Sequence, residues 1–152
     1  YKPKNFLIKD SKYVFFGDEK SDILIITYGR LFSFACECME RLEKQGISAC
    51  ILKLNTVKPI DSGAVIGAKD FKYCFFFEEG ISCGGIGEHF LCKLIENDFT
   101  GKYTLTAIDD QYVEQSTVAS ALKKYKLDTD GMEEVILKKI KCDGELCGKE
   151  KT

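Results

Sequence analysis

The 152-residue sequence predicts a single three-layer α/β/α domain built on a five-stranded, mostly parallel sheet. Three observations lead to this fold class. Short, continuous apolar runs suit strands that are buried on both faces. Between these runs lie segments whose apolar residues recur with the spacing of amphipathic helices. The order of the segments is β-β-α-β-α-β-α-β-α-α, and such alternation predicts right-handed crossovers with helices on both faces of the sheet.

The first half of the chain supplies three of the strands and two of the helices. The expected strands are Tyr13–Phe16, Asp22–Gly29 and Ser48–Leu54. A helix after the second strand is predicted by an apolar stripe of Phe32, Ala35, Cys36, Met39 and Leu42. A short helix that reaches Lys69 is expected next, and either Asp61 or Ser62 can accept hydrogen bonds from its first N–H groups.

The second half continues the alternation and ends in two helices. The expected strands are Tyr73–Phe77 and Tyr103–Ile108. The apolar stripes of the helices comprise Ile86, Phe90, Leu94 and Ile95, then Val118, Ala121, Leu122 and Tyr125, and finally Met132, Val135, Ile136 and Ile140. Asp130 and Glu133 have the spacing of a capping box for the last helix. We expect Ile25, Phe76 and Phe90 to lie in the core.

Composition excludes several classes of protein. Hydrophobic residues make up 45% of the chain and charged residues 30%, which excludes a disordered or proline-rich chain. The net charge is −2 with interleaved signs, so nucleic acid is not an expected partner. No apolar run approaches the length of a membrane span, so no membrane contact is expected either. Residues 1–141 are interpreted as one domain and 142–152 as a charged, flexible tail. The opening at Tyr1 suggests a piece of a longer chain.

The eight cysteines predict free thiols in a reducing cytoplasm. Six of them fall in or beside apolar segments, where a thiol packs as a small hydrophobe; they are Cys36, Cys38, Cys50, Cys74, Cys83 and Cys92. Cys36 and Cys38 are expected to point to opposite sides of their helix. Cys142 and Cys147 lie in the tail without a second pair that would complete a zinc site. We therefore expect no disulfide and no metal.

The stretch FFFEEGISCGGIGEHF, Phe75–Phe90, is the candidate functional segment. Its glycines Gly84, Gly85 and Gly87 could expose backbone N–H groups to an anion, or they could allow close packing of a helix on a strand. The pattern is neither a dinucleotide fingerprint nor a P-loop. Tight packing is the favoured interpretation.

The charged residues of this stretch have structural interpretations as well. Glu78 and Glu79 are adjacent in an extended chain, so their side chains should point to opposite sides. We expect one carboxylate to cap the N–H groups of the glycine turn and the other to lie at a surface or interface. His89 falls on the polar side of its helix, and no nucleophilic triad can be assembled around it. No catalytic and no cofactor-binding residue is predicted.

Four segments, in this order and spacing, resemble the C-terminal domain of the transketolase-like thiamine diphosphate enzymes. They are ILIITYG at Ile23–Gly29, ERLEKQGISACILKLNTVKPID ending at Asp61, FFFEEGISCGGIGEHF, and AIDDQYVEQSTVASALKKYKLDTDGM at Ala107–Met132. The last segment is most similar to the 1-deoxy-D-xylulose-5-phosphate synthase branch. Ser116 follows Glu114-Gln115 where family members often carry glycine, and a transketolase or its separate C-terminal subunit stays an alternative.

The resemblance implies the functional expectations. The parent enzyme would condense pyruvate with glyceraldehyde 3-phosphate and release carbon dioxide, using thiamine diphosphate and Mg²⁺. Those cofactors would be held by the other domains of the parent, and this domain would pack against them and support a homodimer. The sheet would be mixed, with the short first strand antiparallel. The competing hypothesis is a free-standing module that binds a phosphorylated regulator at the glycine turn.

Overall fold

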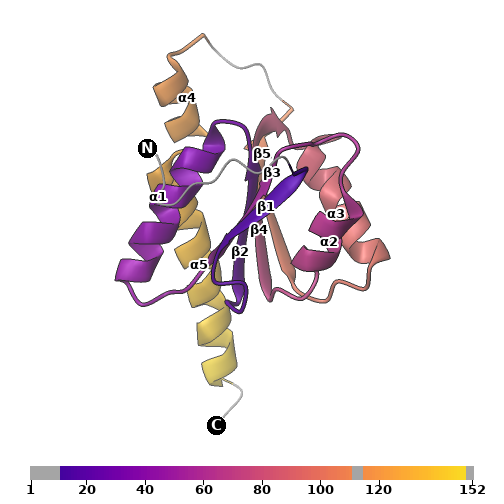
Figure 1. Cartoon of the computed structure of the whole chain (residues 1–152). Coiled ribbons are helices and arrows are strands. Elements are labelled where there is room, and N and C mark those ends of the chain that lie inside the picture. The colour runs from indigo at the N-terminus through magenta and orange to yellow at the C-terminus, as the bar shows by residue number, and fades with distance from the viewer. Residues whose placement is uncertain (1–10, 111–114, 150–152) are drawn as a thin grey trace.

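A computed structural model describes residues 11–110 and 115–149 as an α/β structure around one five-stranded sheet. The strands are β1 (Tyr13–Gly17), β2 (Ile23–Tyr28), β3 (Cys50–Leu54), β4 (Tyr73–Ile81) and β5 (Lys102–Ile108), in the spatial order β1-β3-β2-β4-β5. β1 runs antiparallel to β3, whereas the other neighbouring strands are parallel (Figure 1). The predicted fold class and the antiparallel first strand are thereby confirmed.

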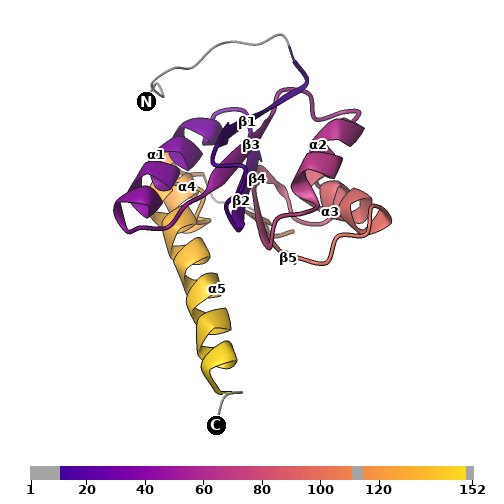
Figure 2. The same cartoon turned by 60° about the horizontal axis from the view of Figure 1, so that its bottom comes forward.

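The helices form two layers, one on each face of the sheet. They are α1 (Leu31–Lys44), α2 (Ser62–Ala68), α3 (Ile86–Glu96), α4 (Val118–Lys124) and α5 (Thr129–Lys149). α1, α4 and α5 lie on one side and α2 and α3 on the other (Figures 1 and 2). Right-handed crossovers that run in opposite directions across a sheet place their helices on opposite faces. The connection from β2 to β3 runs one way and those from β3 to β4 and from β4 to β5 run the other, so α1 lies opposite α2 and α3.

The core is divided by the sheet into two clusters of buried side chains. In β2, Ile23 and Ile25 pack toward α1 and α5, whereas Leu24 and Ile26 pack toward α2 and α3. Successive side chains of a strand point to opposite faces, so a central strand needs the unbroken apolar run that the sequence shows. The expected core residues Ile25, Phe76 and Phe90 are each fully buried, which confirms that prediction.

Several boundaries differ from the sequence expectation. β3 begins at Cys50 rather than Ser48, and β4 continues through Glu78 and Glu79 to Ile81 instead of ending at Phe77. Ile95, expected in the apolar stripe of α3, is 63% exposed. The stripe needs only Phe90 and Leu94 at the sheet, and Ile95 is turned about 100° away from Leu94 on a helix.

The caps of the helices confirm one prediction and correct another. Asp61 caps α2, with its Oδ1 accepting from the N–H of Gly63 at 2.9 Å. The expected capping box of α5 is wrong, because Asp128 Oδ1 accepts from the N–H of Gly131 at 2.9 Å. Asp130 instead pairs with Arg41 of α1 at 2.6 Å.

α5 is tied to α1 by a polar cluster around Arg41. Its guanidinium binds Asp130 and Glu133 of α5, and it also binds Glu37 of its own helix at 2.8 Å. Thr129 donates to Glu37 at 3.1 Å and so closes the cluster. Beyond this contact α5 continues to Lys149, past the predicted domain limit at residue 141, and its last turns project away from the sheet (Figure 2). The division into domain and tail stays a prediction.

Candidate functional site at the carboxyl ends of the strands

Glu78 and Glu79, the two carboxylates that the sequence singled out, lie near the carboxyl end of β4, beside the ends of β2 and β5. In open parallel sheets, ligands usually bind beyond the carboxyl ends of the strands. β4 reaches beyond β2 here, and a register irregularity between Phe77 and Ile81 keeps Ile81 paired with Ile108 at the end of β5. The two glutamates lie within this extension, so the glycine turn begins only after Ile81.

Glu78 is an internal carboxylate, 1% exposed, and it caps α3. Its Oε2 accepts from the N–H of Ile86 and its Oε1 from the N–H of Gly87, both at 3.1 Å. The hydroxyl of Tyr28, at the end of β2, donates to Oε2 at 3.1 Å. A carboxylate at a helix N-terminus meets free N–H donors and the positive end of the helix dipole. The expectation that one of the two glutamates caps the turn is confirmed, and the capping residue is Glu78.

Glu79 points to the other face of the sheet, as predicted, and forms a forked ion pair with Arg30. The Nε of Arg30 donates to Oε1 and Oε2 of Glu79 at 2.9 Å and 2.8 Å, and Nη2 contacts Oε1 as well. The neighbouring carboxylate raises the pKa of Arg30 further above its usual range. The sequence analysis did not single out Arg30. Its position just after the end of β2 is the available signal, and many polar residues at strand ends share that position.

The glycine turn is shaped by close contacts. Gly84 has a φ of +77°, and its N–H donates to Glu88. A Cβ on Gly85 would overlap with the carbonyl oxygen of Ile81 and with Glu78 Oε1. A Cβ on Gly87 would overlap with Leu105 Cδ1 and lie 3.0 Å from Phe76 Cδ1. Gly85 and Gly87 let the first turn of α3 sit directly on β4 and β5, whereas a Cβ on Gly84 would meet nothing within 4 Å and that glycine suits its positive φ.

Several backbone N–H donors that an anion would need at this turn are already in use. The N–H groups of Ile86 and Gly87 donate to Glu78, and the N–H of Ser82 donates to the carbonyl of Ile108 at 2.8 Å. His89 is exposed on α3. An external phosphate would have to displace a buried carboxylate, and the anion-binding role of the turn stays a prediction.

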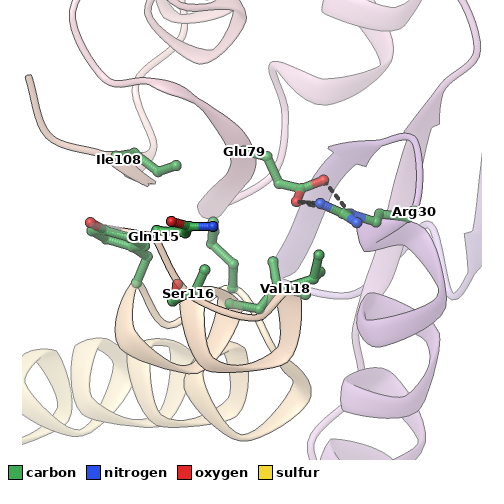
Figure 3. Close-up of a pocket in the computed structure, with 10 residues that line it drawn as sticks. Arg30, Glu79, Ile108, Gln115, Ser116 and Val118 are labelled. Atoms are coloured by element: carbon green, nitrogen blue, oxygen red, sulfur yellow. Dashed lines mark hydrogen bonds and ion pairs between the residues drawn. The ribbon is translucent and has the colours of Figure 1, made fainter. Parts of the chain in front are cut away.

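A groove of about 520 Å³ opens beside the ion pair on the α4 side of the sheet (Figure 3). Arg30, Glu79 and Ile108 come from the strand ends, and Gln115, Ser116 and Val118 face them from the segment that leads into α4 (Figure 3). Ala121, Leu122, Tyr125 and Leu127 complete an apolar floor. Among the described residues that line the groove Arg30 is the one cation, and because Glu79 neutralises it, this lining offers no unpaired cation to a diphosphate.

Tyrosines support the two faces of this turn. Tyr103 of β5 donates to the carbonyl of Gly87 at 2.7 Å, and burial raises the pKa of Tyr103 well above its usual range. Burial also raises the pKa of Tyr28, and the charge of Glu78 beside it adds to the effect. Both phenols therefore remain neutral donors at physiological pH, which is the state their hydrogen bonds require.

The cysteines divide into two groups. Cys36, Cys38, Cys50 and Cys74 are buried, whereas Cys83, Cys92 and Cys142 are exposed, so the expected apolar packing is wrong for Cys83 and Cys92. Cys147 lies among the residues whose side chains are not described. Cys36 and Cys38 are both buried because α1 is covered by the sheet on one side and by α5 on the other. In the described part of the chain no three His, Cys, Asp or Glu side chains converge as metal ligands.

Comparison with known protein families shows to which family the chain belongs. The family model described as "Transketolase, C-terminal domain" matches residues 13–132. The chain belongs to the transketolase C-terminal domain family. The match begins at β1 and ends in the first turn of α5, so it covers the whole sheet of this transketolase C-terminal domain.

Several curated proteins that are similar to this transketolase C-terminal domain carry the same enzyme name. The 1-deoxy-D-xylulose-5-phosphate synthase of Clostridium botulinum (strain Eklund 17B / Type B) is 33% identical over 121 residues, which are 79% of this chain and 20% of that protein. The enzyme of the same name from Clostridium beijerinckii is 29% identical over 119 residues. The 2-oxoisovalerate dehydrogenase subunit beta of Bacillus subtilis is 52% identical over 50 residues, 15% of its length. The chain thus spans about a fifth of the synthases it matches.

A solved structure shares the fold. The protein titled "Split gene transketolase, inactive beta4 tetramer" superposes with a TM-score of 0.76 and 23% identity, over 90% of this chain and 46% of that one. At this identity the likeness concerns the fold alone. No helix in the described residues of our chain is long and apolar enough to cross a membrane.

Proposed function

We propose that this domain is the C-terminal assembly domain of a 1-deoxy-D-xylulose-5-phosphate synthase in the cytoplasm. In that role it packs against the cofactor-binding domains, supports a homodimer, and supplies no catalytic group. The parent would join pyruvate to glyceraldehyde 3-phosphate with loss of carbon dioxide. The similarity to synthases of that name over 79% of this chain supports the choice of parent.

The observation that carries the proposal is the internal use of both candidate carboxylates. Glu78 is buried and bonded to two N–H groups and a phenol, and Glu79 is paired with Arg30. A general acid or base must reach the reacting proton. Neither glutamate is available for this task at the edge where such folds usually place their chemistry, which favours a structural role for the domain.

The cofactors are assigned to the rest of the parent. The sequence contains no Gly-Asp-Gly motif, the feature that holds the diphosphate and Mg²⁺ in the resembled family. We therefore expect thiamine diphosphate with Mg²⁺ to give no heat of binding in calorimetry on the isolated domain. Binding in the micromolar range would refute this part of the proposal.

A chimera tests the assembly role. The segment of the Clostridium botulinum synthase that matches this chain is replaced by residues 11–142, and a second protein simply lacks the segment. We expect the chimera to form the dimer and to turn over substrate, whereas the truncated protein should do neither. A chimera that is no better than the truncated protein would show that the domain serves another parent.

A transketolase subunit is the second candidate. It is favoured by the fold likeness to the split-gene transketolase, of which this chain covers 46%. The corresponding chimera in an active transketolase separates the two candidates, because each parent has its own substrates and only the correct one should regain turnover.

A further inference from the structure

The outer edge of β5 is an open strand edge of the sheet. Within the described residues β5 pairs with β4 alone, and β4 lies on its inner side. Open edges present unpaired N–H and C=O groups, and proteins commonly shorten, charge or cover them. The seven residues of β5, KYTLTAI, contain no proline and one charged residue, at the very start.

The backbone groups that face outward can be named. The N–H of Lys102 donates to Lys72 beside β4, and the carbonyl of Ile108 accepts from Ser82. The N–H and C=O groups of successive residues alternate between the two sides of a strand. The N–H and C=O groups of Lys102 and Ile108 thus face β4, and so do those of Thr104 and Thr106 between them. Tyr103, Leu105 and Ala107 direct their N–H and C=O groups to the open edge.

A groove of about 380 Å³ runs between this edge and α5. Thr104 forms its β5 wall, and Val135 of α5 supplies an apolar contact on the opposite wall. An extended segment laid along β5 would place alternate side chains in this groove. The geometry is that of strand addition, in which backbone hydrogen bonds give affinity and side-chain sites give selectivity.

The charge of the groove selects the partner. Of the described residues that line it, Glu134 is the one carboxylate, and it is paired with Lys126 at 2.6 Å. Lys138 and Lys139 add positive charge to the same groove, on a chain whose net charge is −2. A second copy of this chain would bring two positive grooves together, which is unfavourable. A partner that carries carboxylates complements the groove.

We infer that the outer edge of β5 is a docking site for an extended, acidic polypeptide segment from outside these 152 residues. The segment adds a sixth strand by bonding to Tyr103, Leu105 and Ala107, and its carboxylates meet Lys138 and Lys139. This docking site is independent of which enzyme the domain serves, because it does not involve the strand ends.

The probe is a labelled, acetylated peptide of alternating valine and glutamate, equal in length to β5. We expect it to bind the chain in fluorescence anisotropy and to protect the amides of Tyr103, Leu105 and Ala107 in hydrogen exchange by NMR. The K138E/K139E variant should bind the peptide at least about tenfold more weakly, since close opposite charges are replaced by like charges. The K20E/K44E variant changes two exposed lysines elsewhere and should bind like the parent.

Ala107→Pro separates strand addition from simple charge attraction. It removes one outward N–H while leaving the β4 ladder intact, and proline is tolerated at strand edges. We expect it to weaken peptide binding with little change in circular dichroism. If this variant does not fold, the amide protection pattern of the parent decides. The inference is overturned if the peptide does not bind, if a valine-lysine peptide binds equally, if protection falls elsewhere, or if protection grows with chain concentration alone.

Discussion

The carboxylates of Glu78 and Glu79, adjacent in the chain, lie on opposite faces of the sheet and have unlike environments. Glu78 is 1% exposed and receives the N–H groups of Ile86 and Gly87, whereas the side chain of Glu79 is 31% exposed in its pair with Arg30. Alternation along β4 separates them. The pair thus offers a matched comparison of a buried cap with a surface ion pair.

We predict that Glu78→Ala destabilises the domain far more than Glu79→Ala. The first variant leaves two helix N–H groups and a phenol without their acceptor, a loss of at least about 2 kcal/mol. The second breaks a partly exposed ion pair and should cost about 0–1 kcal/mol. Urea unfolding of both variants measures the difference. Equal losses would contradict the assignment of Glu78 as the cap of α3.

The two neighbouring glycines should respond differently to alanine. At Gly85 the new Cβ would overlap with the backbone carbonyl of Ile81, which cannot move without distorting β4, so we expect a loss of about 2–3 kcal/mol. At Gly84 nothing lies within 4 Å, and the cost is that of a positive φ, about 1 kcal/mol. Thermal unfolding ranks the two variants. If Gly84→Ala were the more harmful, the close approach of the turn to β4 would be misplaced.

Alkaline stability should depend on Tyr103. Its folded-state pKa is raised above the value of 10.0 that a free tyrosine has, because burial disfavours the phenolate and the charges of Cys74 and Glu78 add to this. The stabilisation is therefore complete below pH 10 and is lost progressively as the pH rises above it. Tyr103→Phe should lose about 1 kcal/mol at neutral pH, where the bond to Gly87 is missing, but fall less steeply above pH 10. Urea midpoints of both proteins measured against pH test this prediction. Parallel curves for the two proteins above pH 10 would contradict it.

Thiol reactivity should divide the cysteines by burial. Burial raises the pKa of Cys36 to about 11 and that of Cys74 to about 12, so roughly one thiol in a thousand or fewer is thiolate near pH 8. Brief treatment with a maleimide should label Cys83, Cys92 and Cys142 and spare the buried group. Peptide mapping by mass spectrometry identifies the labelled sites, with the urea-unfolded chain as the control. Rapid labelling of Cys36 would indicate that α1 packs loosely.

The strand and helix pattern was predictable because it depends on neighbours in the sequence. A central strand such as β2 needs an unbroken apolar run, and the Asp61 cap needs only the next two residues. Boundaries were less predictable where tertiary contacts extend an element. Glu78 and Glu79 are poor strand residues by propensity, yet β4 includes them because β2 and α3 supply the partners of Glu78, and Arg30, just before α1, supplies that of Glu79.

Sequence alone determined the fold class, the core residues Ile25, Phe76 and Phe90, and the opposite directions of Glu78 and Glu79. Periodicity encodes these features directly, since side-chain direction repeats every two residues in a strand. Only the tertiary structure decided that Tyr28 donates to Glu78 and that Arg30 pairs with Glu79, contacts that span 50 and 49 residues. The parallel order of β2 and β4 creates them, because it aligns strand ends that are distant along the chain, and no local pattern specifies which polar groups then meet.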